Sequence, residues 1–162
     1  MTPAEIVLVD VDRERRDRLE RLLSEQGYQV ASAPSFHRAK ELLDSLNPDL
    51  LITCVRLDAF NGLHLVIRTR QTHSTLPIIV TDVSTDPVIE AEVWRQGAAH
   101  VTNPLENPEF LHTVKLALAH PRGVAVDDPP GGSQARMRGD RSTHGERTNR
   151  TSRHQPRPPG AH

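Results

Sequence analysis

Four short polar stretches of this chain could do chemistry, because each follows an apolar run and carries side chains able to bind cations or act as nucleophiles. They span residues 10–12, 54–61, 81–84 and 102–105. Asp10 and Asp12 offer the hard oxygen ligands that a divalent cation prefers, although either can equally cap a helix. Cys54 ends an apolar run, where a free cysteine is more often a buried structural thiol than a reactive one. A site exists only if the fold brings these stretches together.

The elements between the stretches predict that they do meet. Five apolar runs, expected as strands, cover residues 6–9, 28–31, 50–55, 78–81 and 99–102. Amphipathic patterns, expected as helices, follow them at about 13–26, 36–46, 62–70, 87–96 and 108–119. Strands that alternate with helices indicate a doubly wound α/β fold with a five-stranded parallel sheet. Because functional groups of such sheets lie at the carboxyl ends of the strands, the four polar stretches are expected at one edge.

Several helix ends can be located from the sequence alone. Asp12 and Ser35 are expected to cap the first two helices, and Gly27 is expected to end the first. The pairs Asp86-Pro87 and Asn107-Pro108 place a capping residue before a proline, a combination typical of a helix start. They predict where the fourth and fifth helices begin.

The near-neutral charge of the chain, 20 basic against 21 acidic residues, hides two unlike segments. Residues 1–120 carry 12 basic and 17 acidic side chains, whereas residues 121–162 carry 8 and 4. The second segment also holds 6 prolines and 6 glycines and few apolar side chains. Such a composition cannot bury enough apolar surface to offset the entropy of ordering. We therefore expect one domain over residues 4–120 and a disordered tail over 121–162, without a folded output module.

Other classes of protein are excluded by composition. No apolar run approaches the roughly 20 residues needed to cross a bilayer, and residues 1–5 do not begin a secretory signal. A single cysteine allows neither a disulfide framework nor a cysteine-rich zinc site. The 9 histidines show no metal-binding spacing and are expected on the surface. We expect a cytoplasmic protein that does not contact membranes.

The order and spacing of several short motifs resemble the receiver domain of two-component response regulators. The motifs are Ile6-Val7-Leu8-Val9-Asp10, Glu25-Gln26-Gly27-Tyr28, Asn47-Pro48-Asp49-Leu50-Leu51, Asn61-Gly62-Leu63, Leu76-Pro77-Ile78-Ile79-Val80, Gly97-Ala98 and Asn103-Pro104. The resemblance covers residues 4 to about 119. It implies a flavodoxin-like fold in which the five strands, numbered along the chain, lie in the order 2-1-3-4-5. It also implies a role in phosphorelay signalling.

The resemblance assigns roles to particular positions, and most of the residues found there differ from the family's usual ones. The first acidic position falls on Asp10, but the second falls on Val11, with Asp12 after it. The phosphoacceptor position falls on Cys54. The hydroxyl position falls on Asp82, and the lysine position on Asn103. Pro104 is retained, and the peptide bond before it is commonly cis in this family.

Each of these differences weakens the chemistry of an aspartyl phosphate. A thiol cannot form an acyl phosphate, and it is too soft to replace a carboxylate on Mg²⁺. Val11 removes a further metal ligand, and Asn103 lacks the positive charge that would stabilise a transferred phosphoryl group. Asp82 would repel an incoming phosphate. We expect a receiver that is not an enzyme, holds no cofactor, binds Mg²⁺ weakly or not at all, and functions without phosphorylation.

Two other functions stay open at this point. A conventional receiver could use a displaced acceptor, either Asp58 or Asp49. Alternatively, the chain could be an adaptor that senses redox state through Cys54 or contacts nucleic acid through its arginine-rich tail. The tail has no aromatic residues for base stacking, so nucleic acid is not the expected partner.

The expected partner is a signalling protein, either a histidine kinase or another regulator. In receivers the fourth helix, fifth strand and fifth helix form the usual face for dimerisation and output. Trp94, Val101 and Leu105 are therefore the contact candidates, and a homodimer could form through the same face. Arg15 and Arg18 occupy positions that are often apolar in receivers, near the surface that meets the kinase, which suggests an altered choice of partner.

Overall fold

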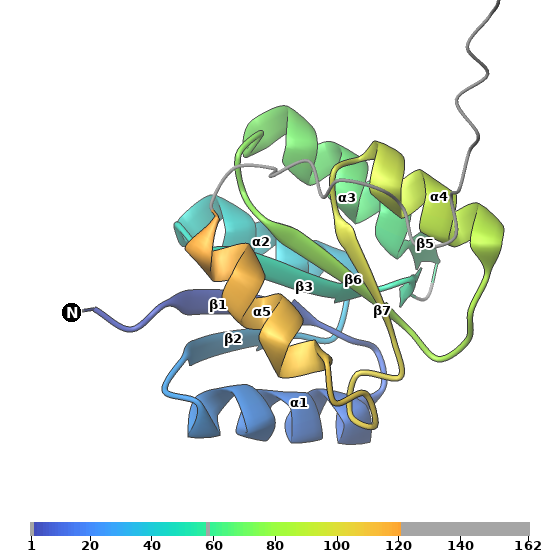
Figure 1. Ribbon diagram of the computed structural model, residues 1–162. Coiled ribbons are helices and arrows are strands. Elements are labelled where there is room, and N and C mark those ends of the chain that lie inside the picture. The colour runs from blue at the N-terminus through green and yellow to red at the C-terminus, as the bar shows by residue number, and fades with distance from the viewer. Residues whose placement is uncertain (1, 58, 121–162) are drawn as a thin grey trace, which may run out of the picture. The chain divides into compact units, whose positions relative to one another are not determined.

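The computed structural model of this chain describes residues 2–57 and 59–120. Strands and helices alternate along it, with one additional pair of short strands (Figure 1). The elements are β1 (Glu5–Val9), α1 (Arg13–Glu25), β2 (Gln29–Ala33), α2 (Phe36–Ser45), β3 (Leu50–Cys54), β4 (Arg56–Leu57), β5 (Phe60–Asn61), α3 (Gly62–Thr72), β6 (Ile78–Asp82), α4 (Pro87–Arg95), β7 (Ala99–Thr102) and α5 (Phe110–Ala119).

The main sheet has five parallel strands in the order β2-β1-β3-β6-β7. Counted within the sheet alone, this order is 2-1-3-4-5, so the predicted fold and topology are confirmed. Strand β2 begins one residue later and ends two residues later than predicted. Its five residues pair with all of β1, from Glu5 opposite Gln29 to Val9 opposite Ala33. Pairing along the full length of the neighbouring strand, rather than the apolar run itself, sets the extent of β2.

Both faces of the sheet are covered, which explains why the central strands show no alternation of apolar and polar residues. One layer of the core joins alternate strand residues such as Val7 and Leu51 to α2, α3 and α4. The other joins the intervening residues, such as Leu8 and Ile52, to α1 and α5. Every residue of β3 and β6 is buried. Because the strands are anchored on both sides, the loops at their carboxyl ends start from fixed positions.

Three of the predicted helix caps are present. The side chains of Asp12, Ser35 and Asp86 each accept a hydrogen bond from a backbone N–H in the first turn of their helix. The predicted start of the fifth helix at Pro108 is wrong, because α5 begins at Phe110. Asn107 instead forms a turn before the helix, with its side chain accepting from Glu109 N and its carbonyl accepting from Phe110 N.

A short hairpin between β3 and α3 was not predicted from the sequence. Strands β4 and β5 pair antiparallel, and Phe60 stacks on Phe36 at the start of α2 with 4.8 Å between ring centroids. The chain then returns so closely to β3 that Gly62 N donates to Val55 O at 2.6 Å. A Cβ atom on Gly62 would overlap the backbone carbonyl of Cys54. This close approach requires glycine and ties the start of α3 to the end of β3.

No helix within residues 2–57 and 59–120 is long and apolar enough to span a membrane. The predicted tail, residues 121–162, lies outside the described residues.

Candidate functional site

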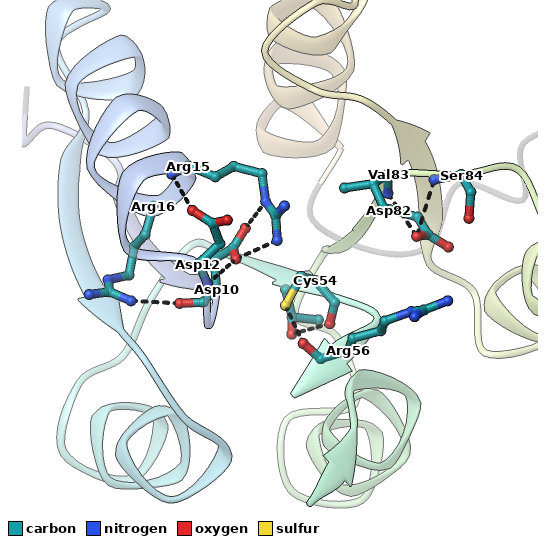
Figure 2. A network of polar contacts seen from close by, with 10 residues as sticks. Asp10, Asp12, Arg15, Arg16, Cys54, Arg56, Asp82, Val83 and Ser84 are labelled. Carbon is teal, nitrogen blue, oxygen red and sulfur yellow. Dashed lines mark hydrogen bonds and ion pairs between the residues drawn. The ribbon is translucent and has the colours of Figure 1, made fainter. Parts of the chain in front are cut away.

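The polar stretches identified in the sequence meet at the carboxyl edge of the parallel sheet, and Figure 2 shows residues of the first three. Asp10 directly follows β1, Cys54 is the last residue of β3, Asp82 is the last residue of β6, and Asn103 follows β7. A cavity of about 210 Å³ lies between these strand ends. Its lining comprises Val11, Asp12, Arg15, Cys54, Val55, Arg56, Thr81, Asp82, Val83 and Pro104. The fold therefore brings residues of all four stretches to one cavity.

Asp10 does not lie free in this site, because Arg15 of α1 binds its carboxylate with two hydrogen bonds. Arg15 Nε donates to Asp10 Oδ2 at 2.6 Å, and Arg15 Nη2 donates to Asp10 Oδ1 at 2.7 Å. The Asp10 side chain is 1% exposed and the Arg15 side chain 24% exposed. Its hydrogen bonds to Asp10 raise the pKa of the Arg15 guanidinium. Such two-pronged pairs are the strong form of an ion pair.

Further hydrogen bonds complete the environment of Asp10. Its Oδ1 also accepts from the backbone N–H of Asp12 at 2.9 Å, and Arg16 Nη1 donates to the backbone carbonyl of Asp10 at 2.8 Å. Asp12 is occupied as well, since its carboxylate accepts from Arg15 N in the helix cap. That backbone hydrogen bond lowers the pKa of Asp12. Both carboxylates at the end of β1 are thus bound within the chain.

The oxygen and sulfur donors of this site do not fit Mg²⁺, the cation that the resemblance implies. Both carboxylate oxygens of Asp10 accept hydrogen bonds from Arg15. The side chain of Val11 has no oxygen, and Cys54 presents a neutral thiol. No group of three His, Cys, Asp or Glu side chains within the described residues could hold a metal ion. A hard cation that demands several oxygen ligands would have to displace Arg15 first.

Cys54 is a buried thiol with a hydrogen-bond partner. Its side chain donates to the backbone carbonyl of Arg56 at 3.0 Å, across the turn that follows β3. Burial, reinforced by the negative charge of Asp10, raises the pKa of Cys54 to about 11. The thiolate is the reactive form, so this environment suppresses the nucleophilicity on which a redox role would depend.

Asp82 is also satisfied locally. Its Oδ1 accepts from the backbone N–H groups of Val83, at 2.7 Å, and Ser84, at 3.3 Å. The residue is 7% exposed and stands on the far side of Cys54 from Asp10 (Figure 2). The site therefore holds a second buried carboxylate, bound by backbone groups.

The turn after β7 differs from the expectation carried by the resemblance. The structure has no cis peptide bond among its described residues, so the Asn103–Pro104 bond is trans. Asn103 instead has φ 47°, a left-handed conformation that asparagine tolerates better than most residues. Its backbone N–H donates to Asp82 O at 2.7 Å, while its side chain is exposed and does not line the cavity. Pro104 is buried against the cavity.

The other predicted residues fall in different places. Asp49 precedes β3 at the opposite edge of the sheet, and its carboxylate accepts from Glu5 N at 2.8 Å. As a displaced phosphoacceptor Asp49 is wrong, because the whole of β3 separates it from the cavity. Asp58 lies outside the described residues. Val101 is wrong as a contact candidate, since it is 5% exposed within the core, whereas Trp94 and Leu105 are half-buried.

Sequence reasoning missed the pairing of Arg15 with Asp10, although a signal was present. Arg15 is the third residue after the Asp12 cap, in the first turn of α1. A cation is unfavourable at the amino end of a helix because the helix dipole is positive there. An arginine at that position therefore indicates a specific anionic partner, and Asp10 is the nearest buried one.

Comparison with known proteins settles the family. The family described as "Response regulator receiver domain" matches residues 6–115. This chain belongs to that family. A signal receiver domain of an HD domain-containing protein from Pseudomonas fluorescens is 28% identical, with a TM-score of 0.69 over 74% of this chain and 98% of that one. The chemotaxis response regulator CheY4 of Vibrio cholerae is 25% identical, with a TM-score of 0.65 over 72% and 99%.

Two longer relatives match this chain over part of their length. The response regulator MprA of Mycolicibacterium vanbaalenii is 32% identical over 135 residues, covering 82% of this chain and 57% of that protein. The DNA-binding transcriptional regulator NtrC of Klebsiella pneumoniae is 30% identical over 132 residues, covering 75% and 28%. The receiver thus spans about a quarter of NtrC and just over half of MprA. These comparisons place it in two-component signalling.

Proposed function

We propose that this receiver acts in two-component signalling through protein contact, without forming an aspartyl phosphate. The observation that carries the proposal is Cys54, which stands where the family's phosphoacceptor falls. Its thiol is buried, donates a hydrogen bond to Arg56 O, and has a pKa raised to about 11. It offers no carboxylate oxygen to attack a phosphoryl group, and it is not poised to act as a nucleophile in its own right.

The surroundings of Cys54 support the same proposal. A phosphoryl group entering the cavity would meet Asp82 at the end of β6, and like charge would oppose it. The positive charge of Arg15 is already taken by Asp10, while Asn103 points no cation into the cavity. Phosphoryl transfer depends on such electrostatic stabilisation. Of the cations lining the cavity, only Arg56 has no carboxylate partner among the ion pairs of the described residues.

The proposed contact surface is formed by α4, β7 and α5, with a signalling protein as partner and a homodimer as one form of the contact. Two large apolar side chains of these elements are exposed, Val88 of α4 at 78% and Leu116 of α5 at 48%. Trp94 is half-buried on α4. Exposed apolar side chains on neighbouring elements are typical of an interaction surface when they form a contiguous patch. That the domain acts without an attached output domain, in the cytoplasm, stays a prediction.

The proposal is tested by incubating the full chain with acetyl phosphate and MgCl₂ and measuring its intact mass. We expect no added phosphoryl group, and a receiver that is phosphorylated under the same conditions provides the positive control. Stoichiometric phosphorylation of this chain would overturn the proposal. Peptide mapping of any modified protein would then decide whether Asp58 is the acceptor.

A single restoring substitution sharpens the test. Cys54→Asp puts a carboxylate back at the end of β3, but Val11 and Asn103 remain and Arg15 still occupies Asp10. We expect this variant to stay unphosphorylated in the same assay. Phosphorylation of Cys54→Asp would mean that Cys54 alone is what blocks the reaction.

A further inference from the structure

The charge of Arg15 lies inside the pocket that receiver domains use for a metal ion. We infer that its guanidinium serves as a built-in cation, which replaces a divalent metal as the permanent counter-ion of Asp10. This inference concerns the same site as the proposed function but stands on the charges of the pocket rather than on the absence of phosphorylation.

Asp10 needs a cation because its side chain is 1% exposed and carries a carboxylate. An uncompensated charge in such a position is strongly unfavourable. Arg15 meets the need with two hydrogen bonds of 2.6 and 2.7 Å, one to each carboxylate oxygen. The guanidinium fork matches the geometry of a carboxylate, and it is permanently charged. Compensation therefore does not depend on any ion in solution.

The same pair excludes a metal ion from Asp10. Oδ1 accepts from both Arg15 and the backbone N–H of Asp12, and Oδ2 accepts from Arg15. Val11 contributes only an apolar side chain, and Cys54 donates its proton to Arg56 O. A divalent ion would have to break two charge-assisted hydrogen bonds while gaining few ligands.

The arginine is held in place by the fold around it. Arg15 leaves α1 in the first turn, where Asp12 caps the helix by accepting from Arg15 N at 2.9 Å. The next residue, Arg16, donates to the carbonyl of Asp10 at 2.8 Å. Figure 2 shows both arginines reaching from the start of α1 to the end of β1. Without Arg15, the carboxylate of Asp10 should need a cation from solution to stabilise the folded protein.

The experiment measures thermal unfolding of the full chain in MgCl₂ or MnCl₂ against NaCl of equal ionic strength. Wild-type protein should shift by less than about 1 °C. Arg15→Ala should melt about 10 °C lower, because it leaves a buried charge unpaired. About 10 mM MnCl₂ should restore about 5 °C to this variant if the freed carboxylate binds the ion with millimolar affinity.

A double substitution provides the matched control. Asp10→Asn together with Arg15→Ala removes the carboxylate as well as the arginine, so it should melt above Arg15→Ala and ignore both metals. A wild-type response as large as that of Arg15→Ala would overturn the inference. So would an Arg15→Ala variant that melts like the wild type, or equal metal responses of the single and double variants.

Circular dichroism covers the case in which Arg15→Ala does not fold. Arg15→Lys keeps the charge without the fork, and both it and the double variant should then be folded in the absence of metal. An unfolded Arg15→Lys would show that a positive charge at this position is not sufficient, and it would overturn the inference. Metal binding by the unphosphorylated wild type would overturn this inference alone, whereas a phosphorylated chain would overturn the proposed function however the variants melt.

Discussion

Two partly buried arginines, Arg15 at the carboxyl edge of the sheet and Arg70 at the amino edge, bind different kinds of partner. Arg15, at the carboxyl edge, binds one carboxylate, and the hydrogen bonds raise its pKa. Among the described residues, Arg70 in the last turn of α3 binds backbone carbonyls and no carboxylate, and burial lowers its pKa. Its partners are the carbonyl oxygens of Ser74, Leu76, Gln96 and Gly97, before β6 and β7.

The difference shows that a buried ion pair stabilises the carboxyl edge, whereas neutral acceptors stabilise the amino edge. Arg70 joins the ends of α3 and α4 to the loops before two strands using neutral acceptors, so it acts as a structural clamp. Arg15 instead neutralises a buried anion, the carboxylate of Asp10. The amino edge is therefore stabilised by hydrogen bonds, whereas the carboxyl edge depends on a balance of charges that a ligand or partner could alter.

The largest effect is expected from Gly62→Ala, which tests how closely the start of α3 must pack against the end of β3. The new Cβ would overlap the carbonyl of Cys54, so either β3 or the start of α3 must move. We expect a loss of about 3 kcal/mol in the free energy of unfolding, measured by urea denaturation. A loss below about 1 kcal/mol would mean that the hairpin of β4 and β5 yields easily.

Arg70→Ala should cost nearly as much at the amino edge, about 2.5 kcal/mol, because four backbone carbonyls, two of them partly buried, lose a charged donor. Arg70→Lys should recover about half of that loss, since one ammonium cannot reach acceptors on both sides of the guanidinium fork. Urea denaturation measures both variants.

Urea denaturation of double variants tests whether each arginine is energetically coupled to Asp10. Combining Arg70→Ala with Asp10→Asn should give additive losses, because the two sites share no partner. Combining Arg15→Ala with Asp10→Asn should not. Coupling between Arg70 and Asp10 would break the distinction between the two edges.

A smaller effect is expected from pH acting on Cys54. The thiol ionises near pH 9 when exposed and at about 11 in the folded protein. Between these values the unfolded chain holds fewer protons than the folded one, so stability is complete below pH 9 and falls as pH rises. At pH 10 the loss amounts to about 1.4 kcal/mol. Comparing urea midpoints at pH 8 and pH 10 should show this extra loss in the wild type relative to Cys54→Ala, and equal losses in both proteins would contradict it.

The smallest effect is expected from an exposed pair that serves as the reference for both arginines. Arg38 Nη1 lies 3.0 Å from Glu41 Oε2 on α2, and both side chains are more than half exposed. Arg38→Gln should change the free energy of unfolding by less than about 0.5 kcal/mol. A larger loss would mean that exposure is a poor guide to the contributions of Arg15 and Arg70.

Much of the fold could be predicted because the relevant signals are local. The uninterrupted apolar runs of β3 and β6 indicated strands covered on both faces, and Asp12, Ser35 and Asp86 marked helix starts. The errors arose where contacts with other segments set the ends of an element. Pairing with β1 set the ends of β2, and the turn at Asn107 delayed α5 to Phe110. The hairpin of β4 and β5 was missed because strands of two residues leave almost no pattern.

By itself, the sequence determined the parallel sheet, the edge at which Asp10, Cys54 and Asp82 gather, and the thiol of Cys54 at the end of β3. These follow from periodicity and residue type, which each segment carries alone. Only the tertiary structure decided that Arg15 binds Asp10, that Cys54 donates to Arg56 O, and that Asp49 stands at the far edge. Each of these depends on where a side chain's nearest partner lies, and burial then makes that partner decisive, because a buried charge must be compensated by whatever the fold places beside it.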